Sequence, residues 1–222
     1  MSSLTLNQAT LARRLTVLGA LLLLLSILGY LLYELILRPR AGFPSDDMAV
    51  ILGGVKTLKV GHWLKFAYAV GTALLTAGLI DRFRSLTPLT TLMLLVGSGA
   101  SALFIASGML GLNLLDTAQS LYPQQLSDAR ATILIRIVTI SLFGAALFLV
   151  GGLIVSSSLA GLLNRAWSRF FAGFGIGVGV LLILEFMTPE PWVVVAPVLG
   201  IVWLGWLMFI RDSSKLEIQQ DL

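Results

Sequence analysis

The sequence contains no cysteine and a single histidine among its 222 residues. The absence of cysteine excludes disulfide bonds, zinc–thiolate sites, iron–sulfur clusters and covalently attached c-type haem. Charged residues are also scarce, at 12%, against about 25% in soluble globular proteins, whereas hydrophobic residues reach 57%. So few charges could not cover the surface of a soluble domain of this length. The composition therefore indicates that most side chains are solvated by lipid.

The small excess of basic residues gives a formal net charge of +4. The lysines and arginines stand in short clusters at the ends of apolar runs. Such positions are typical of anchoring to membrane surfaces and lipid headgroups. We therefore expect membrane lipids as partners and no nucleic acid.

Six apolar runs predict an all-α polytopic bundle, because backbone groups in hydrocarbon must find their hydrogen-bond partners within a helix. The first run is longer than the core of a signal peptide and is followed by Arg38-Pro39-Arg40, so we expect it to stay uncleaved. The six predicted transmembrane helices cover about residues 15–37, 61–80, 89–111, 133–155, 168–187 and 192–210. No alternating ten-residue segments typical of a β-barrel are present.

The distribution of basic residues predicts that both termini are cytoplasmic, by the positive-inside rule. Residues 1–14 then form a cytoplasmic segment and residues 211–222 a cytoplasmic tail, and the membrane is the plasma or inner membrane. The two long outer loops are residues 38–60, with an amphipathic stretch over 48–59 along the interface, and residues 113–132. Eight basic residues are predicted inside, namely Arg13, Arg14, Arg82, Arg84, Arg165, Arg169, Arg211 and Lys215, and five outside, namely Arg38, Arg40, Lys56, Lys59 and Arg130.

Ionisable residues within the apolar runs all fall near the predicted outer boundary. They are Glu34, His62, Lys65, Arg136 and Glu185. On the second helix, the spacing of Lys65, Thr72 and Thr76 places them on one face, together with Lys59 and His62. A polar face on a membrane helix normally looks into the bundle. The sequence thus predicts an outward polar cluster in which Lys65 and Arg136 share Glu34 and Glu185.

Three interpretations of this cluster remain open. The long side chains could simply reach the headgroup layer as interface anchors, they could form structural ion pairs, or they could form a binding site for a zwitterionic or anionic headgroup. His62 could ligate a metal, haem or chlorin, but no second strong ligand accompanies it. We therefore expect neither a metal nor a cofactor.

Four glycines in the fifth apolar run, Gly173, Gly175, Gly177 and Gly179, resemble a nucleotide-binding loop at first sight. They lie inside an apolar helix with no preceding strand, which excludes that reading. They form two overlapping small-xxx-small patterns, which allow another backbone to approach closely. We predict that these glycines are helix-packing positions, either within the chain or between subunits.

The order of the helices, the long first outer loop and three local motifs carry a resemblance. The motifs are the glycine-rich stretch of residues 144–152, the following Leu162-Leu163-Asn164-Arg165-Ala166-Trp167, and the final Val202-Trp203-Leu204-Gly205-Trp206. Over residues 12–210 the chain resembles a bacterial family of six-helix integral membrane proteins catalogued only as a domain of unknown function. That resemblance implies no activity and no site residues.

No catalytic constellation is recognisable in the sequence. A short serine motif at residues 99–102 is similar to that of six-helix rhomboid proteases, but the sixth predicted helix has no histidine to serve as its base. We therefore predict a non-catalytic membrane protein, an accessory subunit or a binder of a lipid-like molecule. The alternative is a small carrier that uses the outward polar cluster. Other membrane subunits or further copies of the chain are the expected protein partners.

Overall fold

The computed structural model describes residues 3–42, 50, 53–121, 129–187 and 195–209. All regular structure within these residues is helical, which confirms the predicted all-α class. The elements are α1 (Ser3–Leu32), a π-helical turn η1 (Tyr33–Leu37), α2 (Arg38–Arg40), α4 (Val55–Arg82), α5 (Thr87–Leu121), α6 (Ala129–Leu163), α7 (Arg169–Met187) and α8 (Val195–Phe209).

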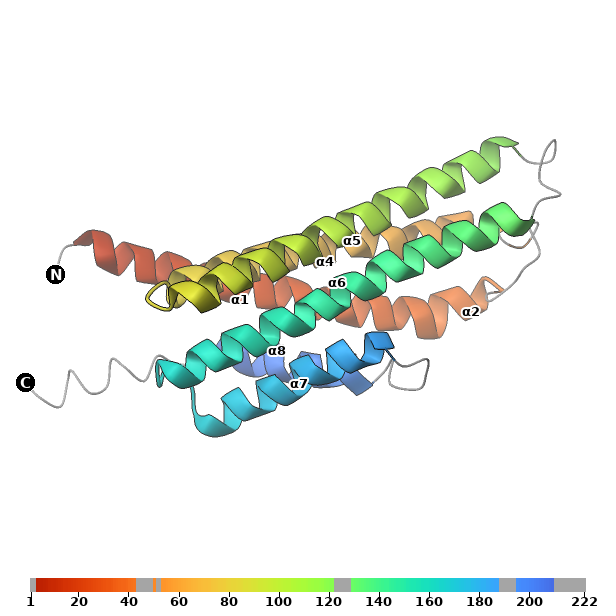
Figure 1. Cartoon of the computed structure of the whole chain (residues 1–222). Coiled ribbons are helices and arrows are strands. Elements are labelled where there is room, and N and C mark those ends of the chain that lie inside the picture. The colour runs from red at the N-terminus through yellow and green to blue at the C-terminus, as the bar shows by residue number, and fades with distance from the viewer. Residues whose placement is uncertain (1–2, 43–49, 51–52, 122–128, 188–194, 210–222) are drawn as a thin grey trace, which may run out of the picture.

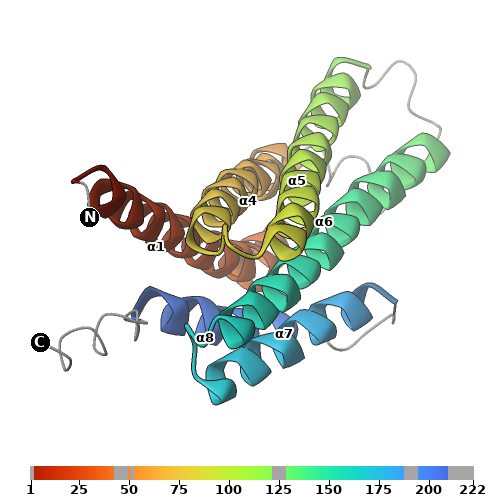
Figure 2. The ribbon, with the colours of Figure 1, turned by 60° about the vertical axis from the view of Figure 1, so that its left-hand side comes forward.

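The helices form a ring in which each packs against the helices before and after it in the chain. The ring closes because α8 also contacts α1. Figure 1 shows the long helices α1, α4, α5 and α6 running side by side, with the shorter α7 and α8 along one flank of the bundle. In Figures 1 and 2 the beginning of α1 and the end of α8 lie at the same end of the bundle.

Four stretches of helix are long and apolar enough to cross a membrane, as judged by length and composition. They are Thr10–Arg40, Val55–Arg82, Thr87–Ser120 and Ile137–Leu163. The remaining two helices are shorter, with 19 residues in α7 and 15 in α8. The described residues thus confirm a chain with several membrane-length helices, and the last two of the six predicted spans are not among these four stretches.

Several helices extend well beyond the predicted spans. With 35 residues each, α5 and α6 are about 52 Å long, whereas the hydrocarbon layer is about 30 Å thick. Residues 113–121 and 129–132, which we expected in an outer loop, are helical, and residues 55–59 begin α4 instead of lying along the interface. Hydropathy identifies only the part of a helix that contacts lipid. Backbone hydrogen bonds and packing against the neighbouring helix stabilise the helix beyond that part, where it extends into water.

Small residues bring α1 and α4 into close contact. A Cβ atom added at Gly19 would lie 2.7 Å from the Cα of Leu75, and one added at Gly78 would lie 2.5 Å from the backbone nitrogen of Thr16. Neither distance is possible for a real side chain, so only glycine allows these two backbones to approach so closely. This contact fixes the rotation of α4 and therefore the direction of its polar face.

Candidate functional site

The polar face of α4 is turned into the bundle. Lys65 is 6% exposed, Thr76 4% and Thr72 fully buried, whereas His62 is half-buried. The helical spacing of these residues had predicted this common direction. Near the start of α4, on the same face, Lys59 forms an ion pair with Asp116 of α5 at 2.6 Å, and both side chains are accessible to solvent.

The ammonium group of Lys65 is bound by neutral groups from two other helices. Its Nζ donates a hydrogen bond of 2.8 Å to Oγ of Ser107 on α5. Ser107 in turn donates a hydrogen bond of 2.8 Å to the backbone carbonyl of Thr139 on α6. The Nζ atom also lies 5.3 Å from the ring centroid of Phe143, within the range of a cation–π contact. Lys65 therefore connects α4, α5 and α6 through one buried chain of contacts.

An aromatic layer fills the centre of the bundle next to Lys65. It contains one ring from each of four helices, Tyr30 of α1, Tyr68 of α4, Phe104 of α5 and Phe143 of α6. Tyr30 stacks on Phe143 with 5.1 Å between centroids, and Tyr68 lies 5.1 Å from Phe104 and 5.8 Å from Phe143. Ring pairs at these separations pack favourably beyond their burial alone. The layer joins helices that are not sequential and leaves the centre of the four-helix core occupied by rings.

Glu34 lies in the π-helical turn of the first membrane helix. Its carboxylate accepts a hydrogen bond of 2.5 Å from Nη1 of Arg38, one turn later. Glu34 also interacts electrostatically with Tyr30 and Lys65. Its ion pair in the described part of the chain is with Arg38 and not with Lys65.

His62 sits one turn from Lys65, against α5. Its ring lies on the bare Cα of Gly111, where any Cβ atom would overlap it, and its backbone carbonyl lies near Gly108. The Nδ1 atom is buried and has no hydrogen-bond partner in the described part of the chain. No group of three or more potential metal-ligating side chains exists among the described residues.

Of the other two predicted members of the cluster, Glu185 is not brought to Lys65, and the position of the Arg136 side chain lies outside the described residues. Glu185 lies on α7, which packs against α6 and α8. Its Oε2 atom is buried without a hydrogen-bond partner among the described residues. The backbone of Arg136 belongs to α6, but its side chain lies outside the described residues. The prediction correctly placed Glu185 near a helix end, but equal depth did not imply a shared face.

The four glycines of α7 divide into two pairs. A Cβ atom at Gly179 would lie 2.6 Å from the backbone oxygen of Gly151 on α6, and one at Gly175 would overlap Ser158 and Trp203. Gly173 and Gly177 are exposed, and no atom of the described chain lies within 4 Å of such a Cβ. Only Gly175 and Gly179 therefore mediate close packing inside the described chain.

Several residues that complete the site carry no signal in the sequence. Ser107 lies in an uncharged apolar run where its hydroxyl resembles any other small side chain, and the acceptor at Thr139 is a backbone carbonyl. Tyr30 lies in an apolar run with no pattern that separates it from other aromatic residues. The one available signal was a pair of glycines on α5, Gly108 and Gly111, whose spacing permits a close approach by α4 at His62.

No protein-family model matches the chain, and no curated protein or solved structure matches it either. The resemblance to the six-helix family of unknown function therefore remains a prediction.

Proposed function

We propose that this chain is a six-span integral membrane protein with cytoplasmic termini, and that it is a non-catalytic binder of a lipid-like molecule with an anionic headgroup. The six-span topology is supported by two features. The start of α1 and the end of α8 lie at one end of the bundle, and basic residues are more numerous in the segments at that end. The proposed ligand is held at the opposite, outer end, by Lys65 and its neighbours.

The observation that carries the proposal is the buried and incompletely satisfied charge of Lys65. An ammonium group has three donors, whereas one hydrogen bond, to Ser107, is present among the described residues. Its nearest carboxylate, Glu34, is already paired with Arg38. Removing a charge from water without a counter-ion is costly. A phosphate or carboxylate headgroup would supply both the missing acceptors and the negative charge.

Two neighbouring features suit the same role. His62 offers a buried nitrogen without a partner one helical turn from Lys65, so it adds a further polar contact for a headgroup. The π-helical turn at Glu34 departs from regular helix beside the cluster, and such turns occur frequently at functional sites. Glu34 of η1 and the α4 residues His62 and Lys65 thus supply three polar groups to the proposed site.

The aromatic layer favours binding over transport. A carrier typically has helices that are broken near the midplane around its substrate site. In the described helices, the π-helical turn lies at the outer end of the first span, and the centre of the core is filled by the rings of Tyr30, Tyr68, Phe104 and Phe143. A headgroup at Lys65 would therefore lie against these aromatic rings, which close the centre of the core beneath it.

The experiment compares Lys65→Met with Lys56→Met, an exposed lysine of the same helix. Lipids extracted from protein purified in mild detergent are identified by mass spectrometry. We expect the parent and Lys56→Met to retain an anionic lipid, and Lys65→Met to lose it by about tenfold or more. Thermal stability of Lys65→Met should be unchanged or higher, because an apolar residue replaces a buried charge. Equal lipid content in the two variants would exclude Lys65 as the anchor.

A further inference from the structure

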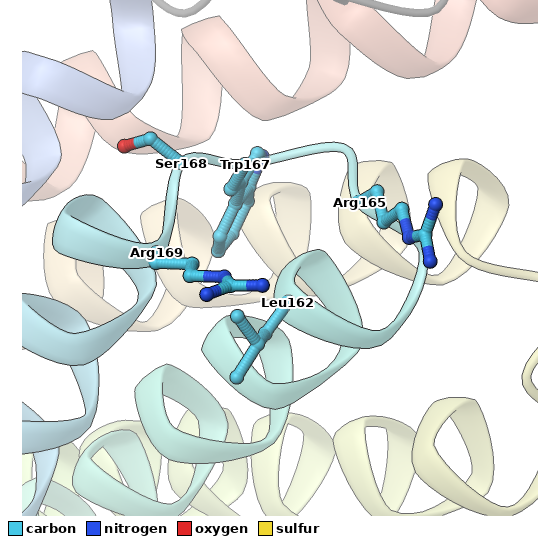
Figure 3. Close-up of a pocket in the computed structure, with 5 residues that line it drawn as sticks. All are labelled: Leu162, Arg165, Trp167, Ser168 and Arg169. Atoms are coloured by element: carbon cyan, nitrogen blue, oxygen red, sulfur yellow. The ribbon is translucent and has the colours of Figure 1, made fainter.

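A second polar site lies at the opposite end of the bundle, in the connection between α6 and α7. This cavity has a volume of about 660 Å³ and is lined by Leu162, Arg165, Trp167, Ser168 and Arg169. Figure 3 shows Arg169 reaching past Trp167 towards Leu162, with Arg165 on the other side of the loop. Two of the five lining residues are cationic and none is anionic.

Neither arginine of this cavity has a carboxylate partner among the described residues. Both side chains are exposed, and neither makes an ion pair or a side-chain hydrogen bond within the described part of the chain. By contrast, Arg38 at the outer end is paired with Glu34. Two unpaired guanidinium groups around one cavity favour an anionic occupant, because guanidinium matches the geometry of phosphate and carboxylate oxygens.

The start of α7 adds neutral donors to the same cavity. Ser168 caps the helix, with its Oγ accepting a hydrogen bond of 3.2 Å from the backbone N–H of Phe171. The first N–H groups of a helix have no acceptor within that helix, and the helix dipole favours negative charge at this end. The Trp167 ring forms a wall of the cavity, and its buried Nε1 has no hydrogen-bond partner among the described residues.

The loop is held in place by the packing of Trp167. Its ring lies against Gly161, where a Cβ atom would overlap it, and packs on Phe83 and Phe171 at 5.4 and 5.0 Å between centroids. The guanidinium of Arg82 lies 5.8 Å from the same ring. The arginines of the loop thus extend from a rigid aromatic base, which reduces the ordering cost of binding.

Arg165 occupies a backbone conformation that usually belongs to glycine. Its φ is 53°, directly after the last turn of α6. Helices commonly end with glycine in this left-handed region, since other residues are strained there. The strain is no evidence of a ligand. It makes Arg165→Gly a useful variant, because stability and binding should change in opposite directions in it.

We propose that this cavity binds the phosphate of an anionic phospholipid at the cytoplasmic surface of the membrane. The lipid source is favoured over a free phosphate because the neighbouring side chains of Leu163 and Phe170 are 65% and 71% exposed and present apolar surface beside the arginines. Acyl chains would pack along these residues while the phosphate contacts Arg165, Arg169 and the start of α7. The site is separate from Lys65, and its occupancy does not depend on the proposed outer ligand.

The test measures binding of phosphatidylglycerol and of phosphatidylcholine with the same acyl chains to the purified full chain, by native mass spectrometry. We expect tighter binding of phosphatidylglycerol, weakened about tenfold in the double variant Arg165→Gln/Arg169→Gln. The matched control is Arg13→Gln/Arg14→Gln, which removes the same charge from the exposed face of α1. This control should bind like the parent, and an equal loss in both double variants would overturn the site in favour of unspecific attraction.

Two further measurements complete the experiment. Arg165→Gly should melt at the same or a higher temperature than the parent yet bind phosphatidylglycerol more weakly, so a loss of binding could not be assigned to misfolding. If it binds phosphatidylglycerol as the parent does, Arg165 is not part of the site and the proposal fails. Inorganic phosphate at millimolar concentration should not displace the lipid; full displacement would indicate a free phosphate as the ligand and overturn the lipid assignment. Lys65→Met should leave this binding unchanged, which separates the two sites.

Discussion

Substitution of glycine by alanine should have opposite effects on stability in the two glycine pairs of α7. Gly175 and Gly177 are two residues apart on one apolar helix, so alanine at either site changes the chain by one methyl group. At Gly175 the methyl carbon would overlap Oγ of Ser158 and Nε1 of Trp203. At Gly177 no described atom lies within 4 Å of it. Helix length and charge are the same in the two variants.

The magnitudes follow from these surroundings. Ser158 and Trp203 are both fully buried, so neither has space to withdraw from the new methyl group. Overpacking of this kind costs about 1–3 kcal/mol. At Gly177 the substitution removes only the conformational freedom of glycine, which stabilises a helix by about 0.5–1 kcal/mol. The free energies of unfolding of the two variants should therefore differ by about 1.5–4 kcal/mol, the sum of the two effects.

The assay is unfolding in mixed micelles of mild detergent and sodium dodecyl sulfate, followed by tryptophan fluorescence and by helical circular dichroism. Gly175→Ala should unfold at a lower fraction of dodecyl sulfate than the parent, and Gly177→Ala at the same or a higher fraction. Similar destabilisation of both variants would refute the reasoning, since it would mean that the Gly173 and Gly177 face is also packed. Repeating the measurement over a range of protein concentrations would then show whether a second copy covers that face.

Three more predictions follow from the structure. A single cysteine at Ser120 should react with an impermeant thiol reagent in intact cells and one at Ser85 should not; the reverse pattern would contradict the proposed orientation. Removing the exposed ion pair by Lys59→Gln or Asp116→Asn should change the unfolding free energy by less than about 1 kcal/mol, and a larger loss would show that the pair is shielded from water. In double-mutant cycles, Lys65→Met should couple with Ser107→Ala by about 1 kcal/mol or more and be additive with Glu185→Gln; coupling to Glu185 in place of Ser107 would contradict the observed contacts.

The direction of side chains on one helix was the part of the fold most accessible from the sequence. A helix rises a fixed 1.5 Å per residue, so counting along an apolar run places each ionisable side chain near one end of that run. The regular turn of the helix likewise gave the common direction of Lys65, Thr72 and Thr76, which the structure buries. Direction within one helix is a local property, and the local pattern was sufficient for it.

The order of helices around the ring was not accessible in this way. Glu185 and Lys65 were expected to meet because they lie near the same boundary, yet α7 is separated from α4 by α5 and α6 along the ring. The four glycines illustrate the intermediate case. Residues two apart in a helix point in nearly opposite directions, so the spacing already implied two faces. Which of these faces meets another helix depended on the placement of α6 and α8.

The partners of Lys65 mark the main difference between the expected and the observed site. A buried charge is costly when isolated, and that argument led to a search for carboxylates among residues of equal depth. The structure instead surrounds Lys65 with a hydroxyl group and an aromatic ring, and the carboxylate of Glu34 is paired with Arg38. These neutral contacts position the ammonium group but do not neutralise it. An ion pair would have favoured a purely structural role for Lys65, whereas its contacts with neutral groups are the basis for the proposal that it binds an anionic headgroup.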